Sequence, residues 1–188
     1  GKGLRAGQAA AWPGTPCRGD VFHAERDAGQ MTTYLDNRAI GSMGEREKSE
    51  RRMARAKKRS QGQSLSRDLA LARQREAQAI ELADDMRLLV RWLHDDILCF
   101  YGPDAATRRE LFDFVISEMD ARKHLAPHRI APICTALKNQ RDDLLTFVEA
   151  IDQELHTIAA HHRVPVEPVR RVFESLRLSP SSSEFWKL

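Results

Sequence analysis

The chain has 188 residues, of which 30% are charged and only 6% are aromatic. Its 30 basic and 27 acidic side chains leave a net charge of only +3, so a polyanion-binding surface over the whole molecule does not follow, and any contact with nucleic acid must come from local clusters. Ala, Leu, Arg, Glu and Gln, all good helix formers, dominate the middle of the chain. The composition therefore favours long solvated helices with narrow apolar faces over a β-rich core.

The first 23 residues predict the end of a helix, a turn and one short strand. Residues 2–12 are rich in alanine and are followed by a Pro-Gly pair, which stops a helix. The next stretch is bounded by Pro and Gly, and its only apolar pair is Val21 and Phe22. We expect a strand whose end lies near residues 20–22.

Two long helices are predicted next. Residues 24–59 are helical in composition and become highly charged in their second half, and residues 60–64 break the pattern as the tip of a hairpin. The following helix carries one continuous apolar stripe at steps of three, four or seven residues. Its members are Ala72, Ala79, Ala83, Met86, Val90, Leu93 and Ile97.

Three further helices complete the pattern. Asp104, after a Gly-Pro pair, is expected to cap a helix over Leu111 to Met119, and Pro127 and Pro132 are expected to lie in the turn that follows. A short helix is predicted over residues 167–176. Between them runs a second long stripe, formed by Ile133, Leu137, Leu144, Val148, Ile151, Leu155 and Ile158. Two such stripes joined by short connections predict a mainly α fold, with long antiparallel helices packed as a bundle or coiled-coil hairpin.

Asp20 and His23 are the first candidates for chemistry. A carboxylate at the exit of a buried strand is held rigidly, and such carboxylates commonly bind divalent metal in phosphoryl-transfer enzymes. His23 lies three residues on, within reach of the same region. The alternative is that Asp20 caps a helix that starts near His23.

The motifs around these residues resemble the central signature of DDE-type transposases of bacterial insertion sequences, which have a ribonuclease-H-like catalytic core. The matching segments are residues 3–6 (GLRA), 12–16 (WPGTP) and 19–23 (GDVFH). In several of these families a catalytic Asp precedes a Gly-Leu helix, a turn follows, and a strand then ends in D-x-x-H or C-x-x-H. Asp20 and His23 would form that motif here.

The remaining chain resembles the long helical insertion that these transposases carry before their last catalytic Glu, especially at residues 51–57, 92–98 and 139–145. The resemblance implies that residues 1–23 are a partial ribonuclease-H-like α/β core, residues 24–176 the helical insertion domain, and residues 177–188 a linker back to the missing core. The chain begins without Met and ends without a stop signal for a fold, so we expect an internal fragment.

In the intact parent, the resemblance implies that carboxylates hold Mg²⁺ or Mn²⁺ and activate water or a DNA 3′-hydroxyl against a phosphodiester. Asp20 would be a metal ligand and, with His23, catalytic. The family needs three acids, however. By this alignment two of them lie before Gly1 and the final Glu lies beyond Leu188, which makes Asp20 an accessory residue unless the register differs. Within this chain, Glu184 is the candidate for the third carboxylate.

The fragment alone is therefore expected to be inactive and to need no cofactor. The resemblance implies contacts with double-stranded transposon DNA and with further copies of itself, in the bacterial cytoplasm at the nucleoid and not at a membrane. No apolar run approaches the ~18 residues that span a bilayer. Cys17, Cys99 and Cys134 are far apart, which suits reduced intracellular thiols.

A basic cluster on the first long helix is the best candidate for phosphate contacts. It consists of Lys48, Arg51, Arg52, Arg55, Lys57, Lys58 and Arg59. Such a cluster predicts sequence-independent, salt-dependent binding. The alternative is a solvated helix face whose charge is offset by Glu45, Glu47 and Glu50. A competing function for the whole chain is a stand-alone helical scaffold or adaptor that oligomerises through its long apolar stripes.

Overall fold

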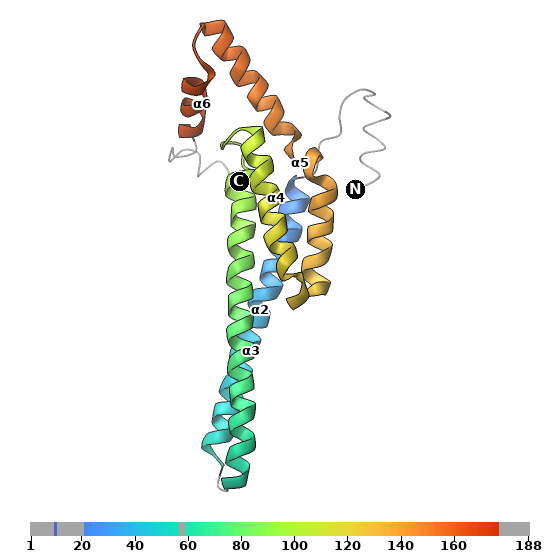
Figure 1. Cartoon of the computed structure of the whole chain (residues 1–188), viewed down its shortest axis with the longest axis vertical. Coiled ribbons are helices and arrows are strands. Elements are labelled where there is room, and N and C mark those ends of the chain that lie inside the picture. The colour runs from blue at the N-terminus through green and yellow to red at the C-terminus, as the bar shows by residue number, and fades with distance from the viewer. Residues whose placement is uncertain (1–9, 11–20, 57–58, 177–188) are drawn as a thin grey trace.

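The computed structural model describes residue 10 and residues 21–56 and 59–176 (Figure 1). In these ranges the chain is all-helical and forms a bundle of five α-helices. Their bounds are α2 Val21–Ala54, α3 Arg59–Trp92, α4 Ala105–Arg122, α5 Pro127–His162 and α6 Val166–Ser175, with a π-helical turn η1 at Leu93–Ile97 and a 3-10 turn η2 at Lys123–Leu125. None of the described helices is long and apolar enough to cross a membrane.

The predicted strand is wrong where the structure describes it. Val21 and Phe22 form the first turn of α2, and none of the described residues lies in a strand. An isolated strand would leave its backbone groups unpaired, whereas a helix satisfies them within its own segment. No part of a ribonuclease-H-like α/β core is therefore seen in the described residues. The rest of the predicted remnant, residues 1–20, lies outside them apart from residue 10, as does the predicted linker 177–188.

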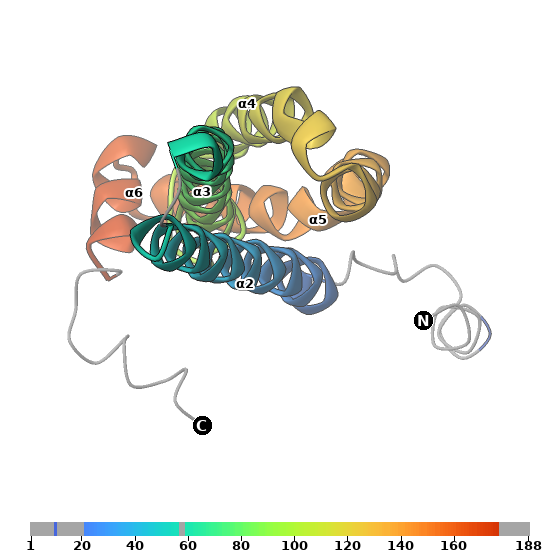
Figure 2. The same ribbon diagram turned by 90° about the horizontal axis from the view of Figure 1, so that it is seen from below.

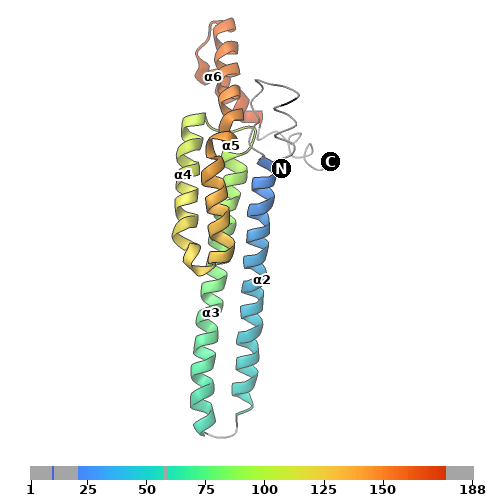
Figure 3. The same ribbon diagram turned by 90° about the vertical axis from the view of Figure 1, so that its right-hand side faces the viewer.

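Helices α2 and α3 form the predicted antiparallel hairpin, and α4 and α5 pack beside its upper half (Figures 1 and 3). Helix α2 ends at Ala54 and α3 begins at Arg59, so the connection of the hairpin precedes residues 60–64, where the sequence suggested it. Residues 60–64 are Ser, Gln and Gly and contain no proline, so the first turns of α3 continue through them.

The predicted apolar stripes form the core, which α2, α3, α4 and α5 enclose when the bundle is seen along its axis (Figure 2). Of the stripe that runs along α3 into η1, the buried members are Ala79, Ala83, Met86, Leu93 and Ile97. Of the stripe on α5, the buried members are Leu137, Leu144, Val148 and Leu155. Pro132 was expected in a turn but lies inside α5, close to its N-terminus, where Pro127 occupies the first turn.

The end of the hairpin projects beyond α4 and α5 (Figure 3). We call residues 40–56 and 59–78 the distal hairpin. Leu69 is its only buried side chain among those the structure describes. Charged groups connect its two helices instead: Arg46 Nε lies 2.8 Å from Glu76 Oε2, and Arg73 Nη2 lies 3.1 Å from Glu50 Oε1. The distal hairpin is therefore a slender, polar extension of an apolar bundle.

Candidate nucleic-acid interface at the end of the hairpin

The predicted basic cluster lies at the far end of α2, where the distal hairpin is most remote from the bundle (Figure 1). Arg51 and Arg52 belong to the last turn of α2, and Arg55 follows it directly. The backbone of residues 57–58 and the side chain of Arg59 lie outside the described part of the chain. The members of the cluster whose side chains the structure describes are Lys48, Arg51, Arg52 and Arg55.

Two of these cations form ion pairs on the helix surface. Lys48 Nζ lies 2.7 Å from Glu45 Oε1, and Arg51 Nη2 lies 3.1 Å from Glu47 Oε2. The hydrogen bond from Lys48 lowers the pKa of the Glu45 carboxyl below its usual value. Pairs this exposed contribute little to stability, so either cation can exchange its carboxylate for a phosphate at small cost.

Arg52 and Arg55 are exposed, and neither forms an ion pair with any described residue. The charge of Arg52 contributes to the lowered pKa of Glu45, so the two groups are near each other without a direct bond. Within the described part of the chain, no carboxylate occupies either guanidinium group, which leaves both available to an anionic partner.

Glu50 was expected to offset the basic cluster, but its carboxylate is engaged elsewhere. Its two oxygens bind Arg46, at 2.7 Å, and Arg73 of α3, at 3.1 Å. The Arg73 hydrogen bond lowers the pKa of Glu50. Since this acid belongs to the charged seam between the helices, it does not neutralise Arg52 or Arg55. The structure thus favours a net positive hairpin end over an evenly neutralised face.

The predicted catalytic residues lie at the other end of α2. His23 is exposed in its first turn, with its ring 5.8 Å from the ring of Phe22. Asp20 precedes the first residue of α2 and lies outside the described residues, as does Glu184. His23 and Arg55 are separated by about 48 Å along the helix at 1.5 Å per residue, so the two predicted sites are distinct.

The described residues do not supply the ligand set that the resemblance implies for Mg²⁺. Among them, no group of three or more His, Cys, Asp or Glu side chains is placed to hold a metal ion. The adjacent carboxylates Asp84 and Asp85 of α3 form ion pairs with arginine: Asp84 contacts Arg87 at 2.7 Å, and Asp85 contacts Arg122 at 2.7 Å.

Sequence reasoning missed an apolar pocket at the bundle end opposite the basic cluster. Its volume is about 560 Å³, and four separate segments line it. They are the start of α2, the connection after η1, the second half of α5, and α6. No spacing in the sequence joins residues so far apart, so only the packing of the helices reveals the pocket.

Comparison with known protein families, with curated proteins and with solved structures finds no match to this chain.

Proposed function

We propose that this chain is the DNA-contacting helical domain of a DDE-type transposase, and that the end of the distal hairpin binds the phosphate backbone of duplex DNA. The observation that carries the proposal is the exposed pair Arg52 and Arg55 at the end of a projecting hairpin whose nearby acid, Glu50, is bound within the seam. Metal-dependent phosphoryl transfer would belong to the rest of the parent protein, with Asp20 and His23 at the junction.

The shape and composition of the distal hairpin support duplex DNA as the ligand. Its helices project from the bundle, and a single α-helix fits the major groove of B-form DNA. Residues 40–78 contain no Phe, Tyr, Trp or His. Recognition of single strands relies on stacking of bases on aromatic rings, so this surface is better suited to phosphates of a double helix.

A scaffold that binds copies of itself is the second candidate, and one observation favours it. Trp92 of α3 and Phe114 of α4 lie with their ring centroids 6.0 Å apart and are 36% and 48% exposed. Leu88, one turn before Trp92, is 46% exposed. Exposed aromatic and aliphatic side chains gathered on one face are typical of protein interfaces.

The test is the salt dependence of binding to a short duplex of arbitrary sequence, followed by fluorescence anisotropy. Arg52→Glu/Arg55→Glu should weaken binding at low salt and reduce the slope of log K against log salt by about two units. Adding Lys57→Glu, Lys58→Glu and Arg59→Glu should abolish it.

The matched control is Arg91→Glu/Arg171→Glu, which makes the same charge change at exposed positions away from the hairpin end. This control should keep the wild-type slope. Equal weakening by both double variants would show that the hairpin end has no special role, and absence of any binding at low salt would refute the proposal. The scaffold candidate is tested by comparing the sedimentation coefficients of Trp92→Ser and the wild type, which report self-association.

A further inference from the structure

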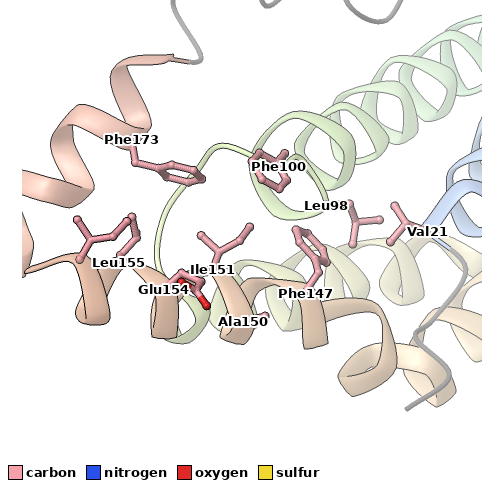
Figure 4. A pocket seen from close by; sticks show the side chains of 10 residues that line it. Val21, Leu98, Phe100, Phe147, Ala150, Ile151, Glu154, Leu155 and Phe173 are labelled. Carbon is pink, nitrogen blue, oxygen red and sulfur yellow. The ribbon is translucent and has the colours of Figure 1, made fainter. Parts of the chain in front are cut away.

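The apolar pocket is lined by residues from both ends of the described chain (Figure 4). Val21, at the start of α2, and Phe147 lie at one end, and Phe173 of α6 faces Phe100 at the other (Figure 4). The ring centroids of Phe100 and Phe173 are 5.8 Å apart, and Phe100 is 50% exposed. Aromatic surface is thus left open at the rim.

The wall formed by α6 is fixed by polar contacts outside the pocket. Arg170 Nη2 donates a hydrogen bond of 2.7 Å to Asp152 Oδ1 of α5. The other oxygen of Asp152 accepts from the backbone amide of Ala105, at 2.9 Å, at the start of α4. Because one carboxylate joins three helices, the position of Phe173 over the pocket is set by the fold.

The lining is apolar with one exception. Glu154 of α5 is its only charged side chain, is exposed, and forms no ion pair with a described residue. A matching occupant would present aromatic or aliphatic side chains next to one cation.

We propose that residues 185–188 of the same chain, Phe185-Trp186-Lys187-Leu188, bind this pocket, with Phe185 and Trp186 in the apolar cleft and Lys187 paired with Glu154. Two of the chain's twelve aromatic residues stand side by side here, and the adjacent cation matches the single carboxylate of the lining. The competing segment, residues 1–20, contains one aromatic residue, Trp12, and offers a poorer match.

The length of chain available fits this assignment. Phe173 already lines the pocket, and the nine residues from Arg177 to Phe185 span at most about 32 Å when extended. Ser and Pro dominate the middle of that stretch, a composition that favours turns over a continued helix. Since the segment is covalently attached beside the pocket, its effective concentration there is high, which favours the same chain over a second copy.

The experiment is photo-crosslinking of the full chain carrying p-benzoylphenylalanine in place of Trp186. The expected product is an intramolecular cross-link to residues 147–158 or to Phe173, identified by mass spectrometry of the digested monomer band. A cross-linked dimer joined at the same peptides would overturn the proposal in favour of a second copy. Cross-links elsewhere, or none, would overturn it altogether.

A charge exchange tests the ion pair without disturbing the core, since Glu154 is exposed. Glu154→Lys should lower the cross-link yield several-fold, and Glu154→Lys/Lys187→Glu should restore it. Glu167→Lys, an exposed acid of α6 outside the lining, is the matched control and should leave the yield unchanged. Equal yields for Glu154→Lys and Glu167→Lys would overturn the pairing. DNA binding at the opposite end of the bundle is measured separately, so either proposal can fail alone.

Discussion

Arg108 Nη1 of α4 donates a hydrogen bond of 2.8 Å to the carbonyl oxygen of Ile97, the last residue of η1. The side chain of Arg108 is only 1% exposed, and its Nε also donates to the carbonyl of Pro103, at 2.7 Å. Burial lowers the pKa of this guanidinium, which nonetheless stays protonated. The connection from α3 to α4 is thus wrapped around one buried cation, which satisfies carbonyl groups left unpaired at the helix end.

Replacing this cation should unfold the connection. Arg108→Ala is expected to lower the free energy of unfolding by about 3 kcal/mol, because it leaves several buried carbonyls without donors. Urea denaturation followed by circular dichroism measures the change. The control is Arg109→Ala, which removes a partly exposed ion pair with Glu149 and should cost less than about 1 kcal/mol. Equal effects of the two variants would contradict the role given to Arg108.

The apolar core gives a second prediction. Leu93 is 1% exposed in the core, so Leu93→Asp should destabilise the protein by about 4 kcal/mol through burial of an unpaired carboxylate. Leu88→Asp makes the same change five residues earlier on α3, where the side chain is 46% exposed, and should change stability by less than about 1 kcal/mol. Thermal unfolding distinguishes them; an unaltered transition for Leu93→Asp would place this residue outside the core.

The sequence predicted the helices well because their apolar residues recur at helical spacing, a local signal. The same kind of local signal failed at Val21 and Phe22, where an apolar pair bounded by Gly and Pro suggested a strand. These residues form the first turn of α2 instead, since a helix pairs its backbone groups within its own segment and needs no neighbouring strand. The sequence pattern also placed the tip of the hairpin several residues too late, because Ser and Gly are as common at the start of a helix as in a loop.

The candidate interface was only partly predictable, for a physical reason. The run of basic residues is visible in the sequence. The ion pair that holds Glu50 between α2 and α3, away from the basic cluster, depends on Arg73, which lies 23 residues away on α3. Arg108 carried no signal either, because its partners are backbone carbonyls that every sequence contains. Contacts between distant segments, rather than residue types, decide both features.

The N-cap of α4 gives a prediction with a pH dependence. Thr107 donates its backbone amide to Asp104 Oδ1 at 2.9 Å, and this bond holds the pKa of Asp104 below its usual value. A carboxyl with a lowered pKa stabilises the fold above its unfolded pKa of about 3.9, and this stabilisation is lost as the pH falls through the folded value.

Asp104→Ala should therefore cost about 1 kcal/mol at pH 7, and the gap to wild type should narrow as the pH falls below about 4. Asp104→Asn keeps an acceptor that does not titrate, so its advantage over the Ala variant should stay constant with pH. Urea midpoints from pH 7 to pH 3 measure both gaps. A wild-type advantage that persists unchanged at pH 3 would contradict the assignment.

The contrast between the two halves of the hairpin predicts unequal local stability. The upper half packs Met31, Leu35 and Met86 into the core, whereas the distal hairpin buries only Leu69 among its described side chains. Regions with few buried apolar contacts open by local fluctuations at a lower free energy than the core. Backbone amides of residues 62–78 should therefore exchange with solvent at least roughly tenfold faster than those of residues 79–92 of the same helix.

Arg46 is the residue on which this local stability should depend most. It contacts Glu76 across the seam and Glu50 one turn along α2, at 2.8 Å and 2.7 Å. Arg46→Ala should accelerate exchange throughout the distal hairpin and leave the upper half unchanged, since no core residue is touched. Arg75→Ala, at an exposed position of α3 in the same region, is the control and should have no such effect. Hydrogen exchange read by mass spectrometry decides the matter: acceleration in both halves would mean that the hairpin opens only as a single cooperative unit.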